Sequence, residues 1–312
     1  WVIPSMIGPF LAGAVAEYLD WRWAFLGVAV LTAIAFAIIA LRLHGVDLGH
    51  GEPQNRRVVV LRLLLAVVVA VLAVVIGFTA DMERGLGWAV AVAALVAIGL
   101  AILPLLPRRT LRAGRGLPSV VLMRGIVAGS FFATEAYIPY LLMERFGWSA
   151  TWAGVALMFA ALAWASASAL QGRYGERLGN HRITLISLSL LTTALIGVLL
   201  TAVLTLSPAI VVIGWGLAGG AMGLLYPRLT VLTLAYSDEA DQGFNSSALS
   251  ISDATGSAVT IAVAGLAVAT LGGGTGVFWV VFAICLALVT LAVVPGFRLG
   301  HAAEDARDAS RG

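Results

Sequence analysis

The sequence predicts an all-α protein, a polytopic membrane helical bundle with about ten transmembrane helices. Hydrophobic residues make up 61% of the 312 residues and charged residues only 11%, whereas a soluble domain carries about 25% charged residues. The mean hydropathy is +1.00. The apolar residues gather in runs of roughly 20, which as helices are long enough to cross a hydrocarbon core of about 30 Å. A helix satisfies its own backbone hydrogen bonds in lipid, so these runs favour a helical bundle.

Ten hydrophobic segments follow one another along the chain. They lie at 1–18, 23–43, 63–80, 86–107, 119–143, 149–170, 183–204, 207–227, 247–270 and 275–295. Two longer connections, 44–57 and 108–118, set off the third and fourth segments, which carry almost no polar side chain. We therefore expect this helix pair to be peripheral and structural. The six helices after residue 118 carry Glu135, Asp253, several serines and threonines and many glycines.

The arginines predict the orientation of these helices. All 19 basic residues are arginine, and alternate connections hold 16 of them on one side and 3 on the other. The first group is Arg42, Arg56, Arg57, Arg62, Arg108, Arg109, Arg112, Arg115, Arg124, Arg173, Arg177, Arg182, Arg228, Arg298, Arg307 and Arg311, and the second is Arg22, Arg84 and Arg145. Cytoplasmic loops carry the excess of basic residues. The larger group therefore marks the cytoplasmic side, which would also hold the polar tail 296–312.

Glu135 lies within the apolar stretch GSFFATEAYIPYLL, about 11 residues beyond Arg124 and near the middle of the predicted helix. A charged side chain at the bilayer centre costs roughly 2.5–3.5 kcal/mol, so such a residue suggests function. Burial favours the neutral acid, which could then exchange a proton when water reaches it. Pro139 weakens the helix nearby. The alternative is a protonated Glu135 that only holds two helices together.

Asp253 belongs to a polar stripe on the helix 247–270. Ser246, Ser250, Asp253, Ser257 and Thr260 are spaced by 4, 3, 4 and 3 residues, which places them on one helix face. A polar stripe on a membrane helix should face the bundle interior or an aqueous cavity. We predict these residues as cavity lining, with Asp253 as a second proton-coupling group, and we include Tyr137 in the lining. The alternative is interhelical hydrogen bonding alone.

Other residue patterns argue against several classes of protein. The single Cys285 rules out a disulfide framework, and His44, Asp47 and His50 lie in a polar loop without the supporting residues that a metal site needs. Enzyme motifs are absent, so neither catalysis nor a cofactor is predicted. The pI near 9.4 comes from arginines dispersed between apolar runs, which indicates membrane topology rather than nucleic-acid binding. Gly216/Gly220 and Gly219/Gly223 have the small-xxx-small spacing of close helix packing.

The stretch IPSMIGPFLAG, followed by WRWAFL, resembles the fifth-helix antiporter motif of the major facilitator superfamily. Gly8, Pro9 and Gly13 fall on motif positions, whereas Ala12 replaces a glycine. A second stretch, GRYGERLGNHR, is similar to the superfamily's cytoplasmic loop motif. The matching residues are Gly172, Glu176, Arg177, Gly179 and Arg182. In the family this loop forms a latch that holds one conformation.

The resemblance is closest to the fourteen-helix drug:proton antiporter branch, in which an extra helix pair separates two six-helix halves. It implies that the chain is a fragment lacking the first four helices. Residues 1–43 would be the last two helices of the N-terminal half, 44–118 the cytoplasmic loops and extra pair, 119–295 the C-terminal six-helix bundle and 296–312 the cytoplasmic tail.

The leading functional hypothesis is a secondary active transporter that exports small amphipathic compounds, neutral or cationic, by alternating access driven by proton influx. Its partners would be a small-molecule substrate, protons and the lipid bilayer, without nucleic acid. We expect a monomer in the plasma (inner) membrane of a bacterium. The alternatives are a non-transporting sensor or scaffold with a transporter-like fold, and a facilitator or importer of another solute.

Overall fold

The computed structural model describes residues 2–43, 56–272 and 275–299, and the regular elements in these ranges are helices. The main ones are α1 (Val2–Tyr18), α2 (Trp21–Leu43), α3 (Arg56–Phe78), α4 (Arg84–Ala101), α5 (Leu117–Phe146), α6 (Ala150–Leu204), α7 (Pro208–Ala235), α8 (Gln242–Thr270), α9 (Trp279–Leu291) and α10 (Val293–Gly296). This confirms the predicted all-α membrane bundle. The loop with His44, Asp47 and His50 lies outside the described residues, as does most of the predicted tail.

Within the described ranges, eight helices are long and apolar enough to cross a membrane. One of them, α6, has 55 residues, which as a straight helix would be about 80 Å long, far more than a bilayer core. It is divided at Gly179, whose φ of 72° and ψ of 164° are not helical. A glycine adopts this conformation without steric penalty. The two arms of α6 correspond to the predicted segments 149–170 and 183–204.

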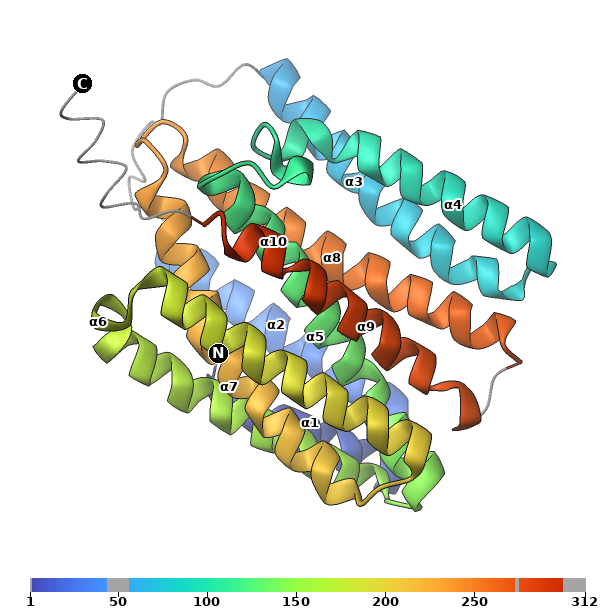
Figure 1. The fold of residues 1–312 in the computed structure, drawn as a ribbon. Helices are drawn as coiled ribbons and strands as arrows, with labels where there is room; N and C mark the ends of the chain where they lie inside the picture. The colour runs from blue at the N-terminus through green and yellow to red at the C-terminus, as the bar shows by residue number, and fades with distance from the viewer. Residues whose placement is uncertain (1, 44–55, 273–274, 300–312) are drawn as a thin grey trace.

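The helices form neighbouring groups around α5 (Figure 1). Helix α5 lies against α8 and α9, and the two arms of α6 pack along α7. Helix α1 packs along α6, with α2 beside it. On another side of the bundle α3 and α4 run next to each other and contact α8. The pair α3 and α4 is therefore attached to the outside of the bundle.

Helices α5 and α8 touch backbone to backbone. A Cβ atom added to Gly256 would overlap the backbone of Gly125, and one added to Gly129 would overlap the backbone of Gly256. Ser252 of α8 adds a hydrogen bond of 2.8 Å from its hydroxyl to the carbonyl of Val121. Small residues allow two membrane helices to approach this closely. The crossing fixes α5, which carries Glu135, relative to α8, which carries Asp253.

Helices α6 and α7 meet through a second glycine contact. Gly219 and Gly223 lie directly against the backbone of Ala160 and Trp164 in the first arm of α6. The predicted close packing is confirmed for this pair. It is wrong for Gly216 and Gly220, because a Cβ atom at either position would meet open space.

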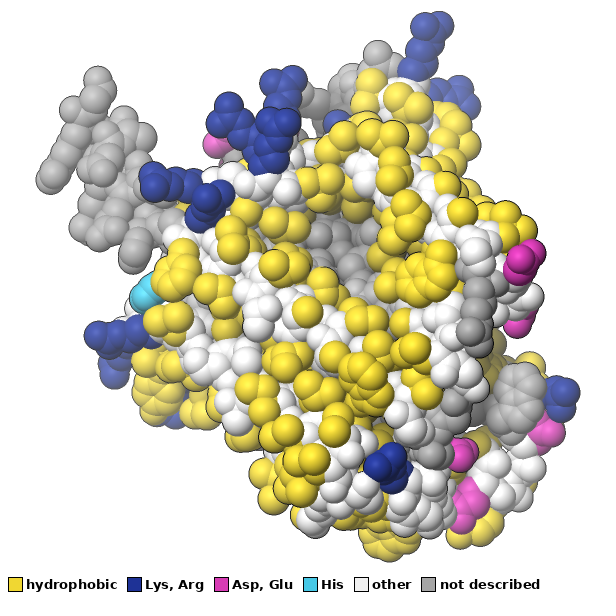
Figure 2. All heavy atoms as spheres, turned by 45° about the vertical axis from the view of Figure 1, so that its right-hand side comes forward, with side chains coloured by type: hydrophobic (Ala, Val, Ile, Leu, Met, Phe, Trp, Pro, Cys, Tyr) yellow, Lys and Arg dark blue, Asp and Glu magenta, His cyan; other side chains and the backbone are white. Residues whose placement is uncertain are grey.

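The surface has the distribution expected of a membrane protein. Large apolar side chains are exposed on the outer helices, among them Phe36 and Leu41 of α2 and Leu63 of α3. Figure 2 shows a mostly apolar middle of one face, with arginine side chains gathered mainly along its upper and left margins. The assignment of the arginine-rich side to the cytoplasm stays a prediction.

Candidate functional site

Glu135 faces a cavity of about 600 Å³ between α5 and the first arm of α6. The lining residues are Phe131, Phe132, Glu135, Ala136 and Pro139 of α5, Leu157, Ala160, Ala161 and Trp164 of α6, and Ile261 of α8. The α5 residues are spaced so that they share one helix face. Glu135 is half-buried and is the acidic residue of this otherwise apolar lining. The cavity has the size of a small-molecule site, for which about 300–1,000 Å³ is usual.

Aromatic rings build the inner wall of this cavity. Phe131 stacks on Trp215 with ring centroids 4.6 Å apart and meets Trp164 edge to face at 5.5 Å. Trp164 in turn meets Tyr226 at 5.0 Å. The indole N–H of Trp215 is buried and has no hydrogen-bond partner among the described residues. The site thus combines one carboxyl group with flat apolar surfaces.

Tyr137 does not line this cavity, and its place in a transport cavity stays a prediction. Two positions along a helix correspond to a rotation of about 200°, so Tyr137 lies on nearly the opposite face from Glu135. Its ring contacts those of Tyr140, at 6.0 Å, and Phe278, at 6.2 Å. It belongs to an aromatic cluster between α5 and the start of α9.

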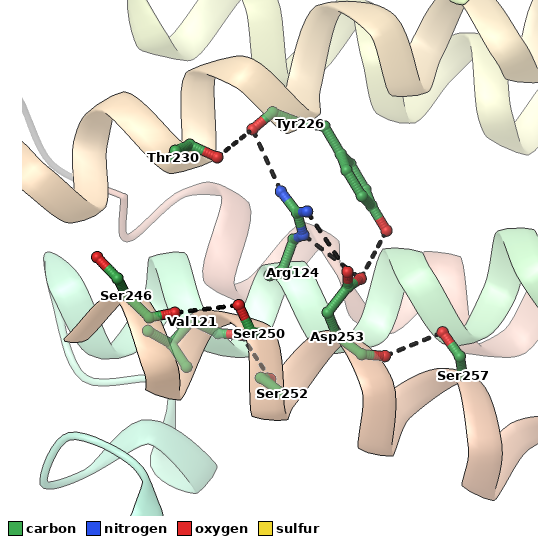
Figure 3. A network of polar contacts seen from close by, with 9 residues as sticks. All are labelled: Val121, Arg124, Tyr226, Thr230, Ser246, Ser250, Ser252, Asp253 and Ser257. Atoms are coloured by element: carbon green, nitrogen blue, oxygen red, sulfur yellow. Dashed lines mark hydrogen bonds and ion pairs between the residues drawn. The ribbon is translucent and has the colours of Figure 1, made fainter. Parts of the chain in front are cut away.

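Asp253 of α8 is paired with an arginine of α5 (Figure 3). Arg124 Nη2 donates to Asp253 Oδ2 at 3.4 Å, and Arg124 Nε lies 3.4 Å from Oδ1 as an ion-pair contact without hydrogen-bond geometry. The Tyr226 hydroxyl donates to Asp253 Oδ1 at 2.8 Å. Arg124 also lies 3.4 Å from the centroid of the Tyr226 ring and donates through Nη1 to the Tyr226 carbonyl. Three helices therefore meet at one charged network.

The hydroxyl stripe of α8 does not line the Glu135 cavity, where α8 contributes Ile261 instead. Ser250, Ser257 and Thr260 donate to backbone carbonyls of α8 four residues earlier. Thr260 is also packed against Gly129 of α5, while Ser246 and Ser250 are exposed. Ser246, Ser250, Ser257 and Thr260 are not among the residues that line this cavity, although Thr260 lines another cavity, against α4; their role in a transport cavity stays a prediction. Such local bonding is common for hydroxyl side chains within helices.

The predicted antiporter motif lies where α1 meets α6. A Cβ atom on Gly13 would lie 2.5 Å from the carbonyl oxygen of Ala150, so the two helices are in direct contact there. One turn further on, Glu17 Oε2 accepts hydrogen bonds from the backbone N–H of Thr151, at 3.1 Å, and from its hydroxyl, at 2.6 Å. Gly8 has open space around it. The side chain of Pro9 lies outside the described residues.

The predicted latch loop joins the two arms of α6. Gly179 supplies the turn, and Gly172 has no neighbour within contact distance. Glu176, Arg177 and Arg182 are exposed, and in the described part of the chain no ion pair joins them. The neighbouring Asn180 instead accepts a hydrogen bond from Arg228 Nε of α7. The hydrogen bond between α6 and α7 at this end of the bundle is thus made by Asn180 and Arg228, which are not among the predicted latch residues.

The bundle, with an acidic residue in an apolar cavity and an ion-paired acid on a neighbouring helix, defines a polytopic membrane protein with an internal polar site. The sequence-family model of the Major Facilitator Superfamily matches residues 1–213 and 120–310 of the chain. The chain belongs to the Major Facilitator Superfamily. Its placement in the fourteen-helix branch, with the matching domain division, stays a prediction.

Known proteins resemble the chain over part of their length. A protein of Escherichia coli O6:H1 named for multidrug resistance, MdtD, is 30% identical over 216 residues, covering 62% of this chain and 44% of that protein. MdtD of Escherichia coli O1:K1 is 29% identical over the same shares. A crystal structure of a bacterial homologue of the iron transporter ferroportin, in an inward-facing state, covers 96% of this chain and 81% of its own, with a TM-score of 0.49 and 17% identity. The chain spans less than half the length of the curated relatives it matches.

Proposed function

We propose that the protein is a secondary active transporter that exports small amphipathic compounds in exchange for protons by alternating access. Membership of the Major Facilitator Superfamily supports transport, and relatives named for multidrug resistance support efflux. The observation that carries the proposal is the Glu135 carboxyl group in the wall of an aromatic cavity within the bundle.

The cavity lining supports amphipathic substrates. Phe131, Phe132 and Trp164 offer apolar ring faces, which bind flat apolar groups and attract cations through the negative face of the ring. An ionised Glu135 would add a full negative charge. Substrates that are neutral or cationic fit this chemistry, whereas an anion would be repelled.

Proton coupling follows from the change of surroundings that alternating access produces. A carboxyl group is favoured as the neutral acid in a dry apolar cavity and as the carboxylate when water enters. Glu135 would take up a proton while the cavity opens outward and release it while the cavity opens inward. One proton then enters the cell as substrate leaves. Rocking of one half of the protein against the other would change the access.

Asp253 is proposed as a second, linked acid. Its charge is balanced by Arg124 at 3.4 Å, so a proton on Asp253 would release the guanidinium from the pair. Arg124 and Glu135 are both on α5. Protonation of Asp253 would thus alter the ion pair between α8 and α5, the helix that carries Glu135.

Transport in everted membrane vesicles tests the role of Glu135. Glu135→Gln keeps the size of the side chain but cannot exchange a proton, so substrate-linked proton flux should be lost. Glu144→Gln is the matched control, because Glu144 is on the same helix and exposed. The proposal fails if Glu135→Gln carries the same substrate-linked proton flux as the unmodified protein.

A further inference from the structure

A cavity of about 290 Å³ lies in the connection between α4 and α5. We call it the arginine pocket, because Arg108, Arg109 and Arg112 line it together with leucines that include Leu106 and Leu111. The three arginines are exposed, as is Leu111. The arginine pocket shares no lining residue with the Glu135 cavity, so the proposed transport function does not use it.

The charge of the arginine pocket is not balanced by the part of the protein that the structure describes. Among the described carboxylates, none forms an ion pair with Arg108, Arg109 or Arg112. The three residues are close together in one short loop, so their positive charges repel each other. A bound anion would offset this repulsion, and the exposed guanidinium groups are accessible to it.

The backbone of this connection is held in one conformation. The Thr110 hydroxyl donates to the carbonyl of Pro107 at 2.6 Å, and Arg298, which follows α10, donates through Nη1 to the carbonyl of Ala113 at 3.0 Å. Arg109 has a positive φ of 68°, which is uncommon for a residue other than glycine. These hydrogen bonds shape the arginine pocket without using the guanidinium groups of the three arginines that line it.

An apolar groove adjoins the arginine pocket. It has a volume of about 300 Å³ and is lined by α4, α5, α8 and Leu288 of α9. Leu106 and Leu111 line both cavities, so the groove begins at the edge of the arginine pocket. Along α4 it follows Ile102 and Leu95, which lie on one helix face. Figure 1 shows this end of α4 at the end of the bundle where α3 and α5 begin.

The groove is open space with mainly apolar walls. Most of its lining residues are leucine, isoleucine, valine or glycine. The Ser252 and Thr260 hydroxyls in its wall already donate to backbone carbonyls. A Cβ atom on Gly99 of α4 would meet nothing within 4 Å. Helix α3 makes most of the contact with α8, which leaves the space beside α4 unfilled by protein.

We infer that the arginine pocket and the groove together bind an anionic phospholipid. Basic pockets at the cytoplasmic side of a membrane bundle bind the head groups of anionic lipids, and the arginine pocket lies on the side predicted to be cytoplasmic. Its arginines hold the phosphate, and one acyl chain enters the groove past Leu106. From Leu106 to Leu95 is about 16 Å along the chain as a helix, close to half of a hydrocarbon core of about 30 Å.

The two parts of the site select this class of ligand together. A soluble anion would contact the arginines but leave the groove empty. An uncharged lipid would fill the groove but leave the three positive charges unbalanced. A zwitterionic head group brings an amine that the guanidinium groups repel. A lipid with a net negative head group satisfies both parts.

Photo-crosslinking of the full-length protein in nanodiscs tests this site. The probe is a phosphatidylglycerol with a diazirine on one acyl chain, present at low mole fraction among phosphatidylethanolamine. Crosslinked peptides are mapped by mass spectrometry. We expect crosslinks in the segments 95–106, 122–126 and 252–260, which form the walls of the groove.

Two arginine variants test the head-group site. Arg108→Gln combined with Arg112→Gln should lower these crosslinks about 25-fold, since each arginine near an anionic lipid contributes a factor of about five. Arg109 is kept, because its positive φ belongs to the shape of the loop. The matched control is Arg42→Gln combined with Arg173→Gln, which removes two exposed arginines of the same predicted side outside the arginine pocket. It should leave the crosslinks unchanged.

A glycine variant tests the groove separately. Gly99→Leu places a side chain in the open space beside α4 and should remove most crosslinks to 252–260. Gly77→Leu of α3 is the control, because a Cβ atom there also meets open space and Gly77 does not line the groove.

Four results would overturn the inference. The first is equal crosslinking by the Arg108/Arg112 variant and its Arg42/Arg173 control, which would leave only a general surface charge. The second is unchanged crosslinking by Gly99→Leu, which would place the acyl chain elsewhere. The third is equal capture of a phosphatidylethanolamine that carries the same diazirine. The fourth is complete competition by inorganic phosphate, which would identify a site for the free anion. Capture that depends on both the two arginines and the open groove supports the proposal.

Discussion

Breaking the Arg124–Asp253 pair should destabilise the protein more than breaking a surface ion pair does. The charged atoms are 3.4 Å apart, and the side chains are only 15% and 25% exposed. At this distance and an effective dielectric constant of about 20, the Coulomb attraction is about 5 kcal/mol before desolvation is subtracted. Removing one partner leaves the other charge partly buried and unpaired, which typically costs about 3–5 kcal/mol. Asp253→Asn should therefore lower the free energy of unfolding by about 3 kcal/mol.

Tyr226 separates the hydrogen-bond contribution from the charge contribution. Tyr226→Phe removes the 2.8 Å hydrogen bond to Asp253 but keeps the ring under the Arg124 guanidinium. A hydrogen bond to a charged group contributes about 1.5–3 kcal/mol, so this variant should lose about 2 kcal/mol of stability.

A double-mutant cycle measures the pair directly. Asp253→Asn, Arg124→Gln and the double variant are unfolded by denaturant in detergent micelles, and their free energies of unfolding are compared. Because each single variant leaves a charge unpaired, the double variant should lose about 2 kcal/mol less than the two single losses together. Losses that add within about 0.5 kcal/mol would refute the coupling.

Two further predictions concern helix contacts. Gly256→Ala should lower the free energy of unfolding by about 1–3 kcal/mol through overpacking, because its Cβ atom would overlap Gly125; Gly220→Ala, in open space, is the control, and equal thermal stabilities would contradict the prediction. Glu17→Ala removes both hydrogen bonds from Thr151, so the distance between spin labels on the adjoining ends of α1 and α6 should become longer and broader. An unchanged distance distribution would show that the contact at Gly13 suffices without Glu17.

The fold was predictable because the length of each hydrophobic run indicates a membrane helix without knowledge of which other helices it contacts. Hydrophobic length and arginine placement are local properties, and they predicted helices whose positions the structure reproduces. The two arms of α6 illustrate this, since Gly179 was singled out in the loop motif and is the point at which the chain turns. Glu135 stood out for the same reason, as one acidic residue within an apolar run.

The partners of the acidic residues could not be predicted from spacing alone. Arg124 was assigned to the cytoplasmic side, although it reaches Asp253, 129 positions away in the sequence. Trp164 gave no periodic signal, yet it lines the cavity with Phe131, and Trp215 stacks behind Phe131. Helix periodicity identified a polar face of α8 but did not show which helices that face would contact. That face turns to α5 and α7 at Asp253, and Ile261 points into the cavity.

The glycine crossing of α5 and α8 has a mechanical consequence. With Gly125 and Gly256 in backbone contact, there is no compliant layer of side chains to absorb a relative shift. A tilt or rotation imposed on one of these helices is transmitted to the other as if they were a single lever. Any such movement of α5 or α8 would therefore displace Glu135 and Asp253 together.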